Sequence, residues 1–381
     1  MNHARQPEVM VVGGGLLGWS AAHRIAKGGR RVAVVDRADA GHATQAGAGI
    51  ICPGASLNAA AGFEAIGRAA VDYYHKLIPE LAEDGAPETG YDTVGILFVG
   101  RDDGEWERLP EAMRTMARRR DAGMGNLGRL EPIDGAAARE LFPPLVDLPG
   151  AIWIPEAARV DGRLLRDALR QAAIRHGAVA IAGDARLVRE VDRVAKVVVG
   201  AETFAPEIVV IAGGAWSNAL GEAIGVTIPV HPQRGQIIHL DLPGVETGRW
   251  PIVEGFSPQY LLTFPGSRVV AGATREHDSG YDVRMTAGGV HSVLTEALRV
   301  APGLAAGTVA EIRIGLRPFS PDGLPFVGNA PGLSNVYLNT GHGPSGLQLG
   351  PVSGAAVAAL IDGETPPFDL AAVDPARWVT A

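Results

Sequence analysis

The sequence predicts an α/β fold with a central parallel sheet. Three observations lead to this class. A strand, a glycine turn, a helix and a second strand fit within residues 9–36, further apolar strands are expected at 207–214 and 335–339, and residues 230–285 are strand-rich. Apolar runs without alternation are typical of parallel strands covered on both faces. The chain has 381 residues, enough for two domains.

The N-terminal unit carries the glycine pattern of a dinucleotide site. Gly13, Gly15 and Gly18 follow the first strand and open the helix. In a Rossmann-type βαβ unit these glycines permit the turn, the approach of a pyrophosphate and the packing of the helix, and the helix N-terminus offers N–H groups to phosphates. Asp36 ends the second strand, where a carboxylate binds ribose hydroxyls and repels a 2′-phosphate. The pattern predicts FAD or NAD; a glycine-rich turn without a ligand is the alternative.

Periodicity and punctuation place the remaining elements. Helices are expected at 16–27, 65–81, 104–121, 161–176, 286–300 and 350–361. Strands are expected at 31–36, 94–99 and 311–317, with a hairpin or meander over 178–200. Parallel-type strands lie at both ends and in the middle of the chain, and antiparallel-type strands lie between them. We therefore expect two domains that the chain crosses more than once.

Composition excludes several classes of function. The net charge is −8, and the densest basic run, residues 118–120, is followed by Asp121, so no nucleic-acid partner is expected. Cys52 is the only cysteine, which excludes an intrachain disulfide and favours a cytoplasmic location. No run of eighteen apolar residues is apparent, so no transmembrane segment is expected. The histidines lack the spacing of metal ligands, and no metal site is expected.

Five ordered segments resemble one known family. They are the fingerprint with Asp36, then TQAGAGI at 44–50, VVIAGGAWS at 209–217, PQRGQ at 232–236, and GLRP at 315–318 with SPDGLP at 320–325 and GHG at 341–343. Together they span nearly the whole chain. On these motifs the sequence resembles the D-amino-acid-oxidase-like flavoproteins, in particular glycine oxidases and the small subunits of D-amino acid dehydrogenases.

The resemblance implies non-covalent FAD and two discontinuous domains. A Rossmann-type FAD-binding domain with a parallel central sheet would comprise 1–85, 151–229 and 320–381, and an α+β substrate domain with a mixed sheet would comprise 86–150 and 230–319. The positions implied to bind FAD are Gly13, Gly15, Leu16, Leu17, Gly18, Asp36, Arg37, Ala43, Thr44, Ala48, Gly49, Ile50, Val188, Gly213, Trp216, His342, Gly343, Pro344, Ser345, Gly346, Leu347 and Gln348.

The resemblance assigns the substrate to the far end of the chain. Members of the family hold the substrate carboxylate with the Arg of the GLRP segment, here Arg317, and with an upstream Tyr, here Tyr260. A guanidinium binds a carboxylate through two parallel hydrogen bonds. A structural ion pair and a core aromatic are the alternatives for these two residues. Arg313 shares a strand face with Arg317 and is a candidate second cation, although an ion pair with Glu311 is favoured.

The last loop departs from the family pattern. Glycine oxidases often carry an Arg two residues after the His of this loop, where the present chain has Pro344. Specificity for glycine therefore does not transfer. His342 is interpreted as a flavin-loop residue rather than a catalytic base, and Cys52 as a small buried hydrophobe.

The implied reaction is FAD-dependent oxidation of the C–N bond of an amino acid or N-substituted amino acid. Hydride transfer from Cα to flavin N5 would give an imine that hydrolyses to a 2-oxo acid. D-amino acids, glycine, sarcosine and opines are candidate substrates. Electrons would pass to O2, or to a quinone or protein partner in a dehydrogenase complex at the inner membrane; homo- and hetero-oligomers both remain open. An NAD-dependent dehydrogenase is the other alternative.

Overall fold

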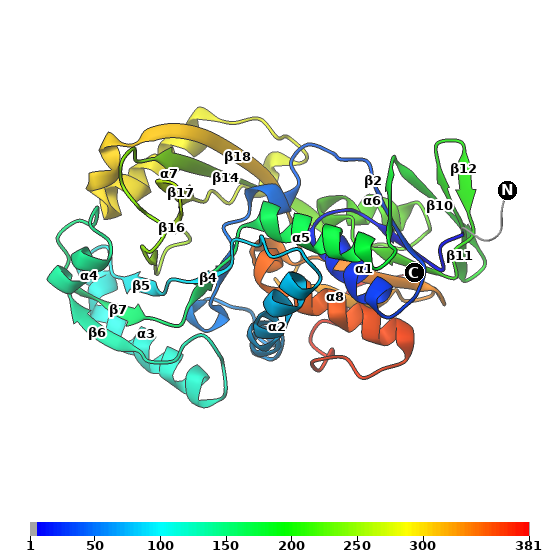
Figure 1. Ribbon diagram of the computed structural model, residues 1–381, viewed down its shortest axis with the longest axis horizontal. Coiled ribbons are helices and arrows are strands. Elements are labelled where there is room, and N and C mark those ends of the chain that lie inside the picture. Colours follow the sequence, from blue (N-terminus) through cyan, green and yellow to red (C-terminus); the bar gives the residue numbers. More distant parts are fainter. Residues whose placement is uncertain (1–5, 381) are drawn as a thin grey trace.

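The computed structural model describes residues 6–380 and contains two large sheets (Figure 1). The first has six strands in the order β19 (Phe326–Asn329), β20 (Val336–Thr340), β13 (Ile208–Ile211), β1 (Val9–Val12), β2 (Val32–Asp36) and β9 (Val179–Ala182). All neighbours are parallel except β19 and β20. The predicted parallel sheet is confirmed.

Both faces of this sheet are covered. One face carries α1 (Leu16–Lys27), α2 (Phe63–Glu83), α5 (Gly162–Arg175) and α8 (Gly346–Asp362). The other carries a small sheet of β10 (Ala185–Glu190), β11 (Arg193–Val199) and β12 (Glu202–Phe204), together with α6 (Ser217–Glu222). Covering on both faces explains why β1, β2 and β13 are apolar without alternation.

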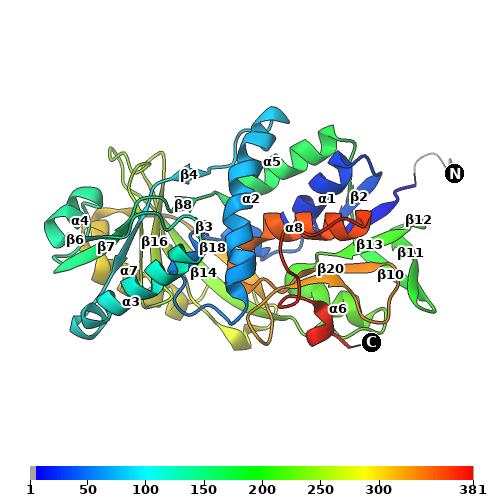
Figure 2. The same ribbon diagram turned by 90° about the horizontal axis from the view of Figure 1, so that it is seen from below.

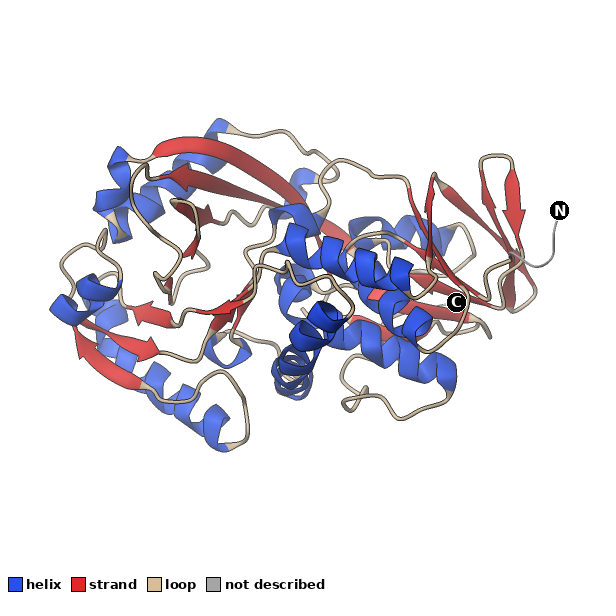
Figure 3. Cartoon of the chain, viewed as in Figure 1, coloured by secondary structure: helices blue, strands red, loops and turns tan. Residues whose placement is uncertain are grey.

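The second sheet is mixed, as predicted. Its eight strands are β18 (Thr308–Phe319), β14 (His231–Asp241), β17 (Arg268–Gly272), β16 (Tyr260–Phe264), β15 (Ile252–Gly255), β5 (Ile96–Val99), β7 (Gly150–Ile154) and β6 (Glu131–Asp134). Only β15 and β5 are parallel neighbours. One face packs on α3 (Asp103–Asp121), and the other on α4 (Gly135–Leu141) and α7 (Ala287–Val300). Figure 3 shows helices and strands in both parts of the molecule.

Short elements join the two parts. A three-stranded sheet contains β3 (Ile50–Ile51), β8 (Ala158–Arg159) and β4 (Asp92–Thr93), and α2 runs across the middle of the molecule (Figure 2). The 3-10 helices are η2 (Ala43–Ala46), η3 (Pro53–Ala55), η4 (Gly214–Trp216), η5 (His277–Ser279), η6 (Pro302–Ala306), η7 (Gly343–Ser345) and η8 (Pro375–Arg377).

Three predicted boundaries need correction. The predicted domain boundary at residue 151 falls inside β7, which pairs with β5 and β6, so the chain leaves the eight-stranded sheet only after Ile154. Within 178–200 only β10 and β11 form the hairpin, because β9 extends the parallel sheet beside β2. The last helix begins at Gly346 rather than 350. The division into two domains otherwise stays a prediction.

One segment has the composition of a membrane span. Gly343–Asp362 is long and apolar enough by mean hydropathy, although Ser345, Gln348 and Ser353 interrupt its apolar residues, so no unbroken apolar run of eighteen occurs there. However, 72% of its most apolar stretch is buried within the protein. Its helix packs closely on α1: a Cβ atom added at Gly354 would lie 2.6 Å from backbone and side-chain atoms of Ser20. We therefore describe α8 as a core helix.

Candidate active site

A cavity of about 390 Å³ is lined by residues of both large sheets. It starts at the glycine turn after β1 and at Asp36, and it extends to Gly235 on β14 and Arg317 on β18. Ligands of open parallel sheets bind at the carboxyl ends of the strands, where this cavity begins. The cavity therefore joins the predicted dinucleotide turn to the predicted substrate residue.

The glycine turn leaves room for a ligand at one position. Gly13 has a φ of +114°, and a Cβ there would lie 2.3 Å from the carbonyl oxygen of Ala212. A Cβ at Gly18 would lie 1.8 Å from the carbonyl oxygen of Gly13, so helix packing requires this glycine. A Cβ at Gly15 would meet only the Thr44 hydroxyl, at 3.4 Å. α1 begins there without a side-chain cap on Gly15; Leu16 N donates to the Thr44 hydroxyl at 3.1 Å, and the N–H groups that follow it in the first turn are available to an anion.

The backbone fixes the Asp36 carboxylate beside this turn. Oδ2 accepts a hydrogen bond from Gly14 N at 2.9 Å, and Oδ1 accepts one from Ala38 N at 2.8 Å. A carboxylate has about four acceptor positions, so others stay free for ribose hydroxyls.

Arg317 lies at the other end of the cavity. Its Nη1 donates to the carbonyl oxygen of Thr274 at 2.9 Å and to Oε1 of Gln233 at 3.3 Å. Nε and Nη2 have no hydrogen-bond partner within residues 6–380. The guanidinium lies over Gly235, where a Cβ would come 2.4 Å from Nη2. Burial lowers the pKa of Arg317, but an arginine remains charged in proteins, so this cation can receive a carboxylate.

Tyr260 lies three strands away from Arg317 in the sheet, with β14 and β17 between them. Tyr260 on β16 pairs with Gly272 on β17, and a Cβ at Gly272 would lie 2.6 Å from the Tyr260 hydroxyl oxygen. Burial raises the pKa of Tyr260 to about 12, although the charge of Arg317 acts in the opposite direction. The hydroxyl therefore keeps its proton and can donate it to an anion. The absence of side chains at Gly272 and Gly235 clears the sheet surface between these two residues.

The structure does not place Arg313 beside Arg317. Its Nε donates to Oε2 of Glu311 at 2.7 Å, which is the ion pair that the sequence favoured. Arg313 faces a separate small cavity with His239 and Phe264. Its candidate role as the second cation of the substrate site is therefore wrong.

Arg275, which sequence reasoning missed, is the cation next to Arg317. It follows Thr274, whose carbonyl oxygen holds Arg317, and its charge acts on both Arg317 and Tyr260. Desolvation lowers the pKa of Arg275, and Tyr260 and Glu254 act in the opposite direction. Arg275 is an exposed residue that makes no ion pair or side-chain hydrogen bond with any other described residue. Its position three residues after β17 becomes informative only once the pairing of β17 with the strand of Tyr260 is known.

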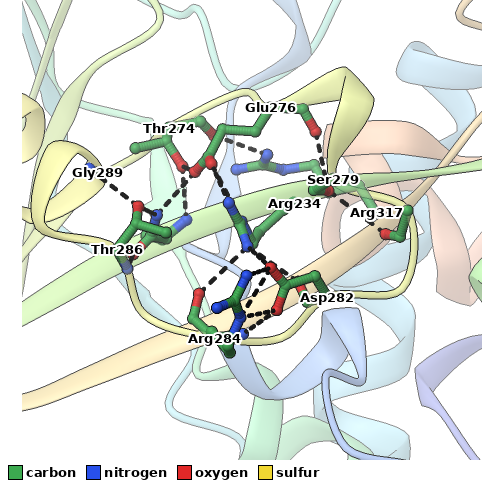
Figure 4. A network of polar contacts seen from close by, with 11 residues as sticks. Arg234, Thr274, Glu276, Ser279, Asp282, Arg284, Thr286, Gly289 and Arg317 are labelled. Carbon is green, nitrogen blue, oxygen red and sulfur yellow. Dashed lines mark hydrogen bonds and ion pairs between the residues drawn. The ribbon is translucent and has the colours of Figure 1, made fainter.

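The segment 273–286 is anchored by a polar network (Figure 4). Glu276 accepts hydrogen bonds from Arg234 Nη2 at 2.6 Å, from Gln236 Nε2 at 2.8 Å and from the Thr274 hydroxyl at 2.7 Å. Further along, Tyr281 stacks on Trp216, with ring centroids 5.7 Å apart. The segment thus reaches from the eight-stranded sheet to the far wall of the cavity and carries Arg275.

Comparisons with known proteins identify the family. Residues 8–360 match the family described as DAO, FAD dependent oxidoreductase. The chain belongs to this family. It is 37% identical to iminodiacetate oxidase from Chelativorans, whose crystal structure gives a TM-score of 0.92 and covers 96% of this chain and 98% of that one. It is 40% identical to the uncharacterized oxidoreductase YurR of Bacillus subtilis, over 96% of this chain and 98% of the relative. Glycine oxidase of Pseudomonas putida is 30% identical, over 97% and 98%.

The protein is therefore an FAD-dependent oxidoreductase of the DAO family. The predicted cofactor and fold are confirmed, and the NAD-dependent alternative is wrong. The turn described above fits FAD, because it combines an open glycine, an uncapped helix N-terminus and a fixed carboxylate.

Most predicted FAD-binding positions line the cavity of this oxidoreductase; their contact with FAD stays a prediction. They are Gly13, Gly15, Leu16, Leu17, Asp36, Arg37, Ala43, Thr44, Gly213, Trp216, His342, Gly343, Pro344, Gly346 and Leu347. Sequence reasoning missed the loop 183–187, which also lines the cavity. Its available signal was Gly183, directly after a strand of the parallel sheet.

Other predicted positions lie behind the cavity wall: Gly18, Ala48, Gly49, Ile50, Val188, Ser345 and Gln348. Two of them have visible structural roles. A Cβ at Gly49 would lie 1.8 Å from the carbonyl oxygen of Val160, so this glycine serves close backbone packing. Oε1 of Gln348 accepts a hydrogen bond from Cys52 N at 3.3 Å. Val188 does not line the cavity, whereas its neighbour Leu187 does, since successive residues of a strand face opposite sides of the sheet.

His342 and Cys52 are both buried. Burial lowers the pKa of His342 to about 3, and its Nε2 lies 2.9 Å from the Ser353 hydroxyl. The imidazole is therefore neutral at physiological pH, as expected for a loop residue. Burial raises the pKa of the Cys52 thiol to about 12. A thiol of that pKa is not a nucleophile at neutral pH.

One residue cluster has the composition of a metal site, contrary to expectation. His23 Nε2 and His176 Nε2 lie 3.0 and 2.9 Å from the carboxylate oxygens of Asp84. The ammonium of Lys27 lies 3.1 Å from the same carboxylate. Because Lys27 already supplies a cation to Asp84, we interpret the cluster as a polar contact between helices.

Proposed function

We propose that the protein oxidises a secondary amine that carries two carboxylates, of the iminodiacetate type. The observation that carries this proposal is that Arg275 directly follows Thr274, whose carbonyl oxygen holds Arg317, and that the charges of both guanidinium groups act on the half-buried Tyr260 hydroxyl. Iminodiacetate oxidase, at 37% identity, supports the same substrate class. Pro344 stands where glycine oxidases often carry an Arg, which argues against glycine.

Three side chains of the protein bind the two carboxylates of the substrate. Arg317 holds the carboxylate next to the carbon that is oxidised, and the Tyr260 hydroxyl donates a further hydrogen bond to it. Arg275 binds the distal carboxylate. Fixing both ends restricts the rotation of the substrate chain and presents one methylene to the cofactor. FAD, when bound, accepts a hydride from that methylene carbon. Hydrolysis of the resulting imine gives glyoxylate and glycine. Reoxidation of the reduced cofactor by O2 would give hydrogen peroxide.

An aerobic substrate screen tests this proposal. The purified yellow protein is assayed with glycine, sarcosine, D-alanine, D-proline and iminodiacetate, and both peroxide and glyoxylate are measured. We expect the highest kcat/KM with iminodiacetate, by roughly tenfold or more, because one more charge-assisted hydrogen-bond pair forms. Equal activity with D-alanine would contradict the proposal. Flavin bleaching without peroxide would instead favour the dehydrogenase alternative, in which electrons pass to a quinone or a partner protein.

A further inference from the structure

Glu254 is a carboxylate in the substrate region that the proposal so far leaves unused. β15 and β16 are antiparallel, with Val253 opposite Leu261, so Glu254 lies opposite Tyr260. Side chains at directly opposed positions share a face, and their Cβ atoms lie about 5 Å apart. Glu254 therefore lies on the sheet face that carries Tyr260, within the same group of strands that positions the substrate-binding hydroxyl.

The surroundings of Glu254 are cationic, yet its carboxylate has no partner. It accepts no hydrogen bond and forms no ion pair within the described part of the chain. Burial raises the pKa of Glu254 to about 7, although the charges of Arg101 and Arg275 act in the opposite direction. Glu254 is half-buried, and a carboxylate partly removed from water without a partner is costly, so this group is expected to meet a hydrogen-bond donor when the site is filled.

The neighbouring groups make their contacts elsewhere. Nη2 of Arg101 donates to the carbonyl oxygen of Gln259 at 2.6 Å, Nη1 lies 3.6 Å from the carboxylate of Glu296, and its buried Nε has no hydrogen-bond partner among the described residues, Glu254 included. The charge of Glu254 acts on the thiol of Cys52, but the Sγ atom of Cys52 lies 3.3 Å from the carbonyl oxygen of Asn126. The remaining charged or titratable neighbours are Tyr260 and Arg275, which the proposed function assigns to carboxylates.

We propose that Glu254 binds the amine nitrogen of the substrate and takes its proton before oxidation. This inference rests on the proposed function. A secondary ammonium enters with two N–H bonds. One N–H bond breaks as the proton moves to a carboxylate oxygen of Glu254, where an O–H bond forms, and the nitrogen keeps the electron pair. Only the neutral amine has the lone pair that forms the C=N bond of the imine.

The charges of site and substrate alternate in the same way. The substrate presents two carboxylates and one ammonium, and the site presents Arg275, Arg317 and Glu254. A site with the two arginines alone would bind the dicarboxylate but would leave the ammonium beside two cations. Glu254 removes this repulsion, and it also distinguishes an amine from a dicarboxylate without nitrogen.

The test compares holoenzyme with Glu254→Gln, Glu254→Asp and the control Glu131→Gln. Glu131 lies on β6 of the same sheet and pairs with Arg129 at the surface. The rate of anaerobic flavin reduction by iminodiacetate is measured from pH 6 to 10. Binding of diglycolate, which has an ether oxygen in place of the nitrogen, is measured from the flavin spectrum.

We expect the wild-type rate to rise with pH and to level off above an inflection near 7, because Glu254 must be ionised to accept the proton. Glu254→Gln should lower the rate at pH 7 at least tenfold, and its rate should keep rising towards the ionisation of the free amine. Glu254→Asp should restore part of the rate. Diglycolate should bind Glu254→Gln at least as tightly as wild type, because a negative charge has been removed. Glu131→Gln should match wild type in both measurements.

Two outcomes would overturn the inference. One is an unchanged rate and pH profile in Glu254→Gln. The other is an equal loss of diglycolate and iminodiacetate binding, which would mean that Glu254 only holds the arginines in place. If wild-type flavin is not reduced by iminodiacetate at any pH, the proposed function fails and the inference fails with it.

Discussion

At the scale of single residues, binding of the substrate carboxylate depends on the shape of the Arg317 side chain. Nη1 is held by Thr274 and Gln233, and two further nitrogens are left for a ligand. A lysine cannot make both sets of contacts. Arg317→Lys should therefore lower kcat/KM about 10- to 100-fold, the effect of losing one charged hydrogen bond. The flavin content per protein should stay that of wild type; unchanged kinetics would contradict the assigned role.

The sequence predicted part of this site. Arg317 and Tyr260 were recognisable because each lies in a motif with a family pattern. Arg275 and Glu254 were not, because their position depends on which strands are neighbours and in which register. The spacing of Arg313 on the strand of Arg317 was a misleading signal, since the local partner Glu311 takes that guanidinium.

At the scale of elements, the first βαβ unit depends on close contact between helix and turn. A methyl group at Gly18 would overlap the carbonyl oxygen of Gly13, at 1.8 Å. Gly18→Ala should therefore shift α1, reduce the flavin content and lower the Tm by roughly 1–4 °C, since overpacking costs about 1–3 kcal/mol. The control is Gly288→Ala in α7, where no atom lies within 4 Å of the added methyl group. Equal Tm values for the two variants would contradict this account of the turn.

Most elements could be predicted from local pattern. The first strand and helix, and the helix capped by Asp161, agree with the structure to within a few residues, because glycines and caps mark their ends. The predicted domain boundary at residue 151 divided β7, because its apolar sequence does not indicate which neighbours it pairs with. The fully apolar α8 reflects contacts with other helices, which local pattern cannot distinguish from contacts with lipid.

At the scale of the whole molecule, His239 lies where the eight-stranded sheet meets residues 44–48. Burial, followed by the charges of Arg313 and Arg268, lowers its pKa to about 4. Between pH 6.5 and 4 the unfolded chain binds a proton at this residue and the folded chain does not, so stability falls as pH falls. Wild type should lose about 2 kcal/mol more than His239→Gln between pH 7 and pH 5.

Urea unfolding of both proteins at the two pH values checks this prediction. The comparison with His239→Gln removes the effect of other titrating groups, including Glu254, whose raised pKa acts in the opposite direction. Parallel losses of stability in the two proteins would mean that His239 is protonated in the folded state.

The central claim is that two cations, Arg317 on β18 and Arg275 on the segment after β17, select a substrate with two carboxylates. The most direct measurement is the ratio of kcat/KM for iminodiacetate to that for sarcosine, which lacks the second carboxylate, in wild type and in Arg275→Met. We predict that this ratio falls roughly tenfold or more in the variant, while kcat/KM for sarcosine changes by less than about threefold. An unchanged ratio would contradict the claim.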